Sequence, residues 1–512
     1  MSSSKENKIV SLVLIVLFAL IFYHVLNYYN QNDSMTFGVL FNSDAAYLPL
    51  LYSNIMEQGG SFVHWKLTPA PYFFPDMFLY FFSNLVTGNY YTAIILSSTL
   101  QFLLLFYFFK KIYQLLFGIK QGFVQAAILM VIIYTFDSYA KFGLVVNAHH
   151  FGALFMGIIA LYYILALLIT VEEDNLYYYF LLLIVNILIV MSDKLYIVQF
   201  LIPFSLVLFF VFILNKRLRK KVIIILFALV LSVILGYLFN YWLVSNPTGF
   251  SPHFSFSYIQ DNIPKFRHYL KYIVNYNLYS VLALVTLYIL IFILYFFKKS
   301  QFTNKDSVIV HFLILVCLLS PMVNIVVLLL SNLAVNVRYM FPVFFMPLLI
   351  IPLILNYIQE KFFNKYPKHL QYGVLLFCIV WLAFLYSKKI SFDGMKYDYY
   401  PKETQCLDNF IKNKSSKKGI SEYWDAKKNT LLSKENILVT QFNYFVDPYL
   451  WICTSDWYNQ KFNFALIRNS DAHVKQFEEN LLKINGKPDE IHDCRVFKVY
   501  YYSNGLKVNH QL

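Results

Sequence analysis

Long apolar stretches alternate with short polar stretches along the first three quarters of the chain. Because about 20 apolar residues in a helix cross the hydrocarbon core of a membrane, eleven of these stretches predict membrane-spanning helices. They cover residues 9–28, 90–109, 124–139, 151–170, 176–191, 195–214, 222–244, 279–297, 308–330, 337–357 and 372–386. The pattern therefore predicts an all-α polytopic membrane bundle over residues 1–386.

The pattern changes after residue 386, because residues 387–512 are polar, rich in lysine and free of long apolar runs. Segments 402–413 and 472–484 have the periodicity of amphipathic helices. Three further segments are rich in the β-branched and aromatic residues typical of strands, namely 436–442, 462–468 and 494–502. Residues 387–512 are therefore predicted to form a small α/β domain.

The composition supports a membrane protein and argues against a nucleic-acid-binding protein. The chain is 59% hydrophobic and only 14% charged, and a soluble protein of this length does not bury so much apolar surface. The net charge of +14 is attractive for nucleic acid. However, most lysines and arginines fall in clusters between the apolar stretches, where they set membrane orientation instead.

The distribution of these basic clusters predicts the orientation of the chain. With the N-terminus in the cytoplasm, the cytoplasmic segments carry more than twice as many lysines and arginines as the opposite loops. The stretch 9–28 is too long for a signal-peptide core and no cleavage site follows it, so we interpret it as an uncleaved anchor. The long loop 29–89 and the C-terminal domain are then both expected on the outer face.

Unusual polar residues gather in the loops that this topology places outside. They include Asp44, His64, Asp76, Asp137, Lys141, Asn147, His149, His150, Asp193, Lys194, Arg267, His268, Asn336 and Arg338. The opposite loops hold mainly basic clusters. Because reactive and binding groups concentrate where polar residues converge, we expect a site on the outer face.

Each candidate has a structural alternative. Asp44 follows Asn42 and Ser43, so it could cap a helix that begins near Ala45, and we expect that helix to lie flat on the membrane surface. Asp193 and Lys194 could pair with each other in a turn. An arginine at the mouth of a span, such as Arg338, could either snorkel to the interface or clamp a phosphate.

Metal binding is not predicted from the histidines or cysteines. Consecutive residues on a helix point about 100° apart, so His149 and His150 do not share a ligand direction, and one of them is expected to bind an anion. In the C-terminal domain, two of three cysteines could pair in an oxidising compartment. The sequence does not specify which two of Cys406, Cys453 and Cys494 pair.

Several motifs in this order resemble the GT-C superfamily of membrane glycosyltransferases. They are FNSDAAY around Asp44, the proline-rich TPAPYFFPD, the short SDK turn at 192–194 and NVRYMFP at 336–342. The resemblance is to the branch with lipid A aminoarabinose transferases, protein O-mannosyltransferases and rhizobial lipopolysaccharide transferases. It covers most of the chain in layout and about the first 360 residues in motif.

The resemblance implies a polyprenyl-phosphate sugar donor, an acceptor on the outer face and inversion at the anomeric carbon. Asp44 matches the family's catalytic acidic position, and Arg338 loosely matches a basic position near the donor phosphate. Many relatives carry two acidic residues in the first loop, whereas this chain has Ser43 before Asp44, which puts a divalent metal in doubt.

These observations predict a membrane glycosyltransferase of the cell envelope, in a bacterial inner membrane. Asp44 is expected to act as the general base with Asp76 as a secondary polar contact. Substrate or phosphate binding is assigned to a second set, His149, His150, Asp193, Lys194 and Arg338. The acceptor is expected to be a glycolipid, a glycan or a protein.

Three other classes of protein remain open from the sequence. A flippase or transporter of lipid-linked sugars would carry polar residues deep in its spans, and these spans are largely apolar. An O-antigen polymerase or ligase would centre on a late outer loop, for which 245–277 is a modest candidate. A scaffold that only displays the C-terminal domain is the third alternative.

Overall fold

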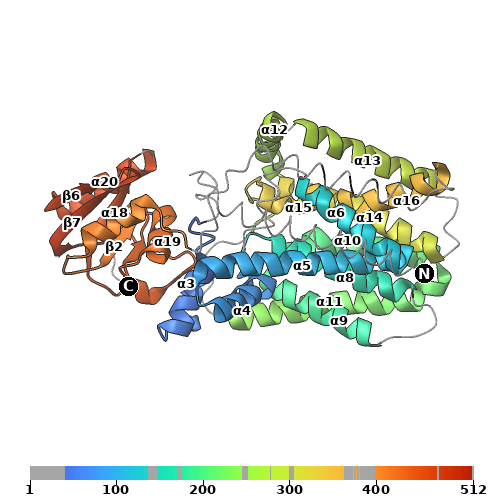
Figure 1. The fold of residues 1–512 in the computed structure, drawn as a ribbon, viewed down its shortest axis with the longest axis horizontal. Helices are drawn as coiled ribbons and strands as arrows, with labels where there is room; N and C mark the ends of the chain where they lie inside the picture. The colour runs from blue at the N-terminus through green and yellow to red at the C-terminus, as the bar shows by residue number, and fades with distance from the viewer. Residues whose placement is uncertain are drawn as a thin grey trace.

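A bundle of long helices and a smaller α/β domain at one end of it make up the protein (Figure 1). The computed structural model describes residues 41–135, 148–169, 176–244, 252–276, 278–298, 305–362, 373, 376, 380, 398–469 and 472–509. The predicted first span, nearly all of the last span, the boundary at residue 386 and Asp137, Lys141 and Asn147 lie outside these ranges.

Most of the predicted spans within the described ranges coincide with helices of the bundle. The bundle helices are α4 (Phe78–Thr87), α5 (Tyr90–Phe117), α6 (Ile119–Thr135), α8 (Phe151–Ile169), α9 (Leu176–Ser192), α10 (Ile202–Leu214), α11 (Arg219–Leu243), α12 (Tyr258–Tyr276), α13 (Leu278–Lys298), α14 (Lys305–Leu330), α15 (Phe341–Phe345) and α16 (Ile351–Phe362). Within the described ranges, five helical segments are long and apolar enough to cross a membrane, as in a helical membrane protein: Tyr90–Phe117, Phe151–Ile169, Ile197–Leu214, Lys216–Leu243 and Val308–Leu330.

Helices α8 and α11 show how the bundle separates its interior from its exterior. Nearly every residue of α8 is buried, and a Cβ added to Gly157 would lie 2.5 Å from the Phe200 ring, so this close contact requires glycine. Helix α11 instead exposes a stripe of large apolar side chains at helical spacing, Ile223, Phe227, Val230 and Ile234. Such a stripe matches a hydrocarbon environment rather than water.

The C-terminal domain contains a five-stranded mixed sheet in the order β3-β2-β5-β7-β6. Its strands are β2 (Lys418–Ser421), β3 (Leu438–Gln441), β5 (Phe462–Arg468), β6 (Glu490–Asp493) and β7 (Phe497–Leu506), and its helices are α18 (Lys402–Ile411), α19 (Tyr423–Leu432) and α20 (Ala472–Asn485). Strand β2 is parallel to β3 and β5, whereas β7 is antiparallel to β5 and β6. The predicted helices and all three predicted strands overlap the observed ones, whereas β2, α19 and β6 were not predicted.

The C-terminal domain is attached to the first loop by a short sheet and by side-chain contacts. Strand β1 (Trp65–Lys66) pairs antiparallel with β4 (Cys453–Thr454). Next to this pair, the Trp65 and Trp457 rings meet edge to face at 5.6 Å, and His64 Nδ1 lies 3.0 Å from an Asp456 carboxylate oxygen. These contacts hold the domain against the loop that carries Asp44.

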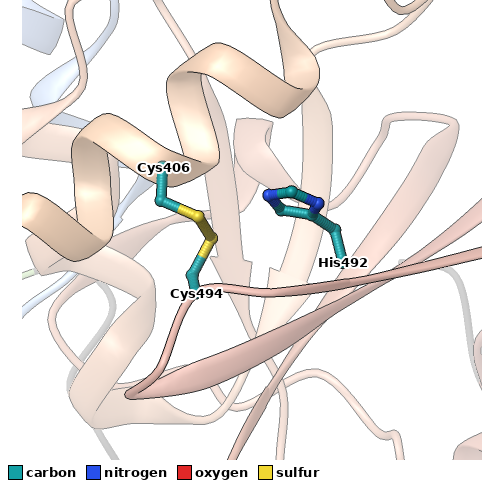
Figure 2. A group of neighbouring side chains, drawn as sticks. All are labelled: Cys406, His492 and Cys494. Atoms are coloured by element: carbon teal, nitrogen blue, oxygen red, sulfur yellow. A yellow bond between two sulfur atoms is a disulfide. The ribbon is translucent and has the colours of Figure 1, made fainter.

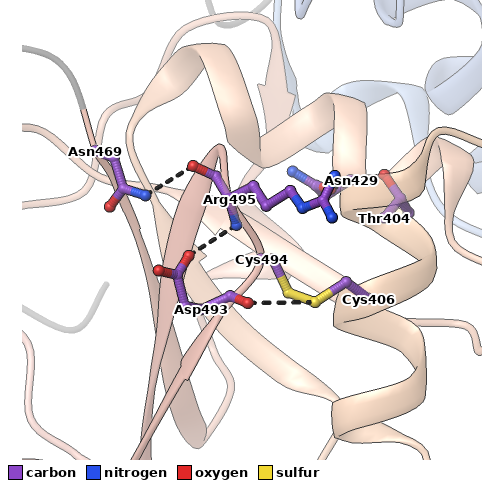
Figure 3. The surroundings of a disulfide bond; sticks show 7 residues. All are labelled: Thr404, Cys406, Asn429, Asn469, Asp493, Cys494 and Arg495. Atoms are coloured by element: carbon purple, nitrogen blue, oxygen red, sulfur yellow. Dashed lines mark hydrogen bonds between the residues drawn. A yellow bond between two sulfur atoms is a disulfide. The ribbon is translucent and has the colours of Figure 1, made fainter.

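One disulfide links Cys406 of α18 to Cys494, which follows β6 (Figure 3). Cys453 is the cysteine of this domain that stays reduced, and it is buried. The ring of His492 lies beside the disulfide (Figure 2). One ring nitrogen of His492 and the two sulfur atoms lie within 4.8 Å of one another. Both sulfurs are consumed by the disulfide, so this cluster offers no thiolate to a metal.

We expect thiol labelling of the denatured full-length protein to reproduce this pairing. Peptides with Cys406 and Cys494 should react with an alkylating reagent only after reduction, whereas the Cys453 peptide should react without reductant. Replacing both paired cysteines with serine should destabilise the domain by about 2–4 kcal/mol, because the bridge closes a long loop. A Cys453 bridge in the mass spectrum would contradict the assignment.

Candidate active site

The segment after Phe41 brings Asp44 to the junction between the bundle and the C-terminal domain. The side chain of Asn42 accepts a hydrogen bond from the Ala45 N–H at 2.9 Å and so closes the turn before helix α3 (Tyr47–Tyr52). The N-cap position of α3 is occupied by Ala46, and no side chain makes a capping hydrogen bond there. The interpretation of Asp44 as a helix cap is therefore wrong.

Helix α3 also differs from the expected interfacial helix. All six of its residues are buried, and it packs against both α4 and α19 of the C-terminal domain. A helix lying on a membrane surface would have kept a polar face exposed to water. The expectation failed because the C-terminal domain covers the face that we assigned to solvent.

The Asp44 carboxylate is held between the two parts of the protein. Its Oδ2 lies 3.4 Å from Nη1 of Arg338, and its Oδ1 accepts a hydrogen bond from the Tyr423 hydroxyl. Burial raises the pKa of Asp44, but His149, the Tyr423 hydrogen bond, Lys427 and Arg338 together outweigh burial and hold that pKa below its usual value. Asp44 is thus ionised and able to accept a proton.

Arg338 lies in the short turn η7 (Val337–Tyr339), ahead of α15. The Asn336 side chain accepts the Arg338 N–H at 3.3 Å and fixes the start of the turn. The guanidinium lies 5.0 Å from the centre of the Tyr339 ring. Its Nε is buried and makes no hydrogen bond within the described part of the chain, whereas the side chain as a whole is 32% exposed and can meet an anion.

His150 and Asp193 form a buried hydrogen-bonded chain near Arg338. His150 Nδ1 lies 2.7 Å from Asp193 Oδ2, and its Nε2 lies 3.1 Å from the Tyr72 hydroxyl. Asp193 therefore pairs with His150 and not with Lys194, so the alternative in which Asp193 and Lys194 pair with each other in a turn is wrong. The Lys194 ammonium instead lies 5.1 Å from the centre of the Tyr237 ring, and burial lowers the Lys194 pKa.

A cavity of about 470 Å³ joins these groups. Five of the seven predicted site residues line it: Asp44, His150, Asp193, Lys194 and Arg338. Much of the remaining wall is apolar, and it includes Leu195, Val198, Val244, Val327 and Leu333. The cavity therefore has a charged region and an apolar wall, a combination suited to an amphipathic ligand.

The other two predicted residues, Asp76 and His149, are buried beside the cavity and are not among the residues that line it. Asp76 Oδ1 accepts the Ala148 N–H at 2.9 Å, and a Cβ added to Gly152 would collide with its other oxygen. Burial raises the pKa of Asp76 to about 6. This contact fixes the first loop to the start of α8, so Asp76 has a structural role in the described contacts.

Two residues next to Asp44 were not predicted from the sequence, Tyr423 and Lys427. Both belong to α19, and Lys427 is only 1% exposed. Nothing in the local sequence marks them, because a tyrosine and a lysine in a polar domain are ordinary surface residues. Their role depends on the docking of α19 against the first loop.

Comparisons with known proteins give no relative from which a role could be transferred. No protein-family model matches the chain, and no curated protein matches its sequence. The functional assignment therefore depends on the chemistry and geometry of the cavity.

The raised pKa of Asp76 predicts a pH-dependent stability difference. Because its folded pKa of about 6 exceeds the ordinary 3.8, the carboxyl stabilises the fold fully below about pH 4 and loses this effect as pH rises through 6. At pH 8 the free energy of unfolding of Asp76→Asn should therefore exceed that of wild type by up to about 3 kcal/mol, and the variant should unfold at a higher temperature. At pH 4 this difference should disappear.

Thermal unfolding of the purified protein in detergent measures this difference. Asp44→Asn provides the control of opposite sign, because the pKa of Asp44 is lowered and its ionised form stabilises the fold at neutral pH. A gap between Asp76→Asn and wild type that stays constant from pH 4 to pH 8 would rule out this account of Asp76.

Proposed function

We propose that this protein is a membrane glycosyltransferase of the GT-C type that transfers a sugar from a polyprenyl-phosphate donor to an acceptor hydroxyl. The observation that carries the proposal is the convergence of Asp44, His150, Asp193, Lys194 and Arg338 in one cavity. These residues come from four separate segments of the sequence.

Asp44 and Arg338 supply the two groups that an inverting transfer needs, a base and a cation. The Asp44 carboxylate takes the proton of the acceptor hydroxyl as its oxygen bonds to the anomeric carbon. The bond from that carbon to the phosphate oxygen breaks on the opposite face, and its electron pair leaves with the polyprenyl phosphate. Arg338 and Lys194 supply positive charge to the leaving phosphate, and no covalent enzyme intermediate is needed.

The apolar wall of the cavity suits the lipid part of the donor. Leu195 and Val198 follow the SDK turn, Val244 directly follows α11 and Val327 belongs to α14, so bundle segments form this wall. An isoprenoid chain lying along them would keep its phosphate at the charged region. The volume of about 470 Å³ is within the range of pockets that hold small ligands.

We further propose that the chain spans the membrane eleven times, with its N-terminus in the cytoplasm and the C-terminal domain on the outer face of a bacterial inner membrane. The disulfide between Cys406 and Cys494 supports the placement of the C-terminal domain on the outer face, because disulfides persist in oxidising compartments. In cells, labelling of both cysteines without reductant would argue for a cytoplasmic domain. With the domain on the outer face, the acceptor is a glycolipid or glycan of the cell envelope, or a protein.

Asp44→Asn tests the proposed reaction. Asparagine keeps the size of the side chain but cannot take the proton, so we expect the rate of sugar transfer to fall about a hundredfold or more. The assay uses purified full-length protein in liposomes, a panel of radiolabelled polyprenyl-phosphate hexoses and pentoses as donors, and total envelope glycolipid as acceptor. The donor that wild type uses is then given to each variant.

Asp456→Asn is the matched control. Asp456 is also an aspartate at the domain junction, but it pairs with the exposed His64 and does not line the cavity. This control should keep wild-type transfer, and size-exclusion profiles should match for all three proteins. Full transfer by Asp44→Asn would eliminate Asp44 as the base, and transfer by wild type from none of the donors would overturn the proposed function.

A further inference from the structure

The start of α19 and the segment around Asp44 hold each other by hydrogen bonds in both directions. The Tyr423 hydroxyl donates to Asp44 Oδ1, and the hydroxyl of Ser43 donates back to the Tyr423 carbonyl oxygen. The two partners are almost 380 residues apart in sequence. The orientation of the Asp44 carboxylate therefore depends directly on the C-terminal domain.

Lys427 follows Tyr423 by one helical turn and lies on the same face of α19. Its ammonium is 4.4 Å from the centre of the Tyr423 ring and donates to the Trp451 carbonyl at 3.2 Å. Lysines are rarely buried this completely, since removing the ammonium from water is unfavourable. Burial lowers the pKa of Lys427 to about 8, although Cys453 and Asp44 act to raise it.

The charged and titratable groups that face Asp44 come from both parts of the protein. The first loop and the bundle supply Arg338, His149, Tyr72 and Tyr339, and the C-terminal domain supplies Tyr423, Lys427 and Tyr449. Trp451 and Ile452 of the same domain also line the cavity. The site around Asp44 is thus incomplete without the C-terminal domain.

We propose that Tyr423 and Lys427 are positioning residues, through which the C-terminal domain orients the Asp44 carboxylate and keeps it ionised for the transfer reaction. This inference rests on the proposed function of Asp44 as the base. Tyr423 fixes Oδ1 by its hydrogen bond, so Oδ2 is the oxygen that takes the proton of the acceptor hydroxyl. Lys427 adds a positive charge that water does not screen.

The pH profile of kcat/KM for sugar transfer tests the inference, because its acidic limb reports the pKa of the base in the free enzyme. Tyr423→Phe and Lys427→Met each remove one interaction that favours the ionised carboxylate. Each should move the acidic limb up by about one pH unit, with the loss of activity largest at low pH. Lys427→Arg retains the charge and should leave the limb near its wild-type position.

Matched controls exist in the same domain. Tyr458→Phe removes a buried hydroxyl that donates to the Gln441 and Tyr449 carbonyls, and Lys428→Met removes a lysine that pairs with Glu403 at 2.8 Å. Neither group contacts Asp44 in the described structure. Both controls should keep the wild-type acidic limb, even if they lower stability.

The outcomes separate this inference from the proposed function. If Asp44→Asn loses transfer while Tyr423→Phe and Lys427→Met lower activity equally at every pH, the two residues only stabilise the domain and the inference is wrong. If Asp44→Asn transfers sugar normally, the proposed function itself fails. Should Lys427→Met not fold, Tyr423→Phe, which removes a single hydroxyl, decides the question alone.

Discussion

The carboxylate of Asp44 is the point on which the arrangement of the protein depends. Arg338 approaches it from the helical bundle, and Tyr423 donates to it from the C-terminal domain. A buried carboxylate is strongly unfavourable unless partners replace its lost hydration. Asp44 is therefore a place where the bundle, the first loop and the C-terminal domain must all be assembled correctly.

A comparison of Asp44 with Asp76 shows how the surroundings determine the role of a carboxyl group. Both belong to the first loop and both are largely removed from water. Cations and a hydrogen-bond donor lower the pKa of Asp44, whereas burial dominates at Asp76 and raises its pKa to about 6. Asp44 also lines the cavity, whereas Asp76 is fixed against the start of α8. These differences favour Asp44 as the reacting group.

The sequence predicted the features that follow from local patterns. Apolar stretches of spanning length located most bundle helices in the described ranges, and the change in polarity after residue 386 indicated a separate α/β region. The polar residues of the loops predicted to lie outside included the charged residues that line the cavity. In these cases the signal came from composition and periodicity, which burial in lipid or protein imposes directly on the sequence.

The wrong or missing predictions concern contacts between distant segments. Helix α3 was assigned to the membrane surface because the covering helix α19 cannot be inferred from residues 45–52. A pairing of Asp193 with its neighbour Lys194 was left open as an alternative, although the partner of Asp193 is His150, 43 residues away. Tyr423, Lys427 and the pairing of Cys406 with Cys494 were likewise not specified, since each depends on tertiary packing.

A structure of the full-length protein with a polyprenyl-phosphate sugar bound would test the central claim most directly. The account predicts the phosphate within hydrogen-bonding distance of Arg338, with the anomeric carbon of the sugar facing Asp44. The isoprenoid should follow the apolar wall that includes Val198 and Val327. A donor bound outside this cavity, or bound with its sugar turned away from Asp44, would contradict the account.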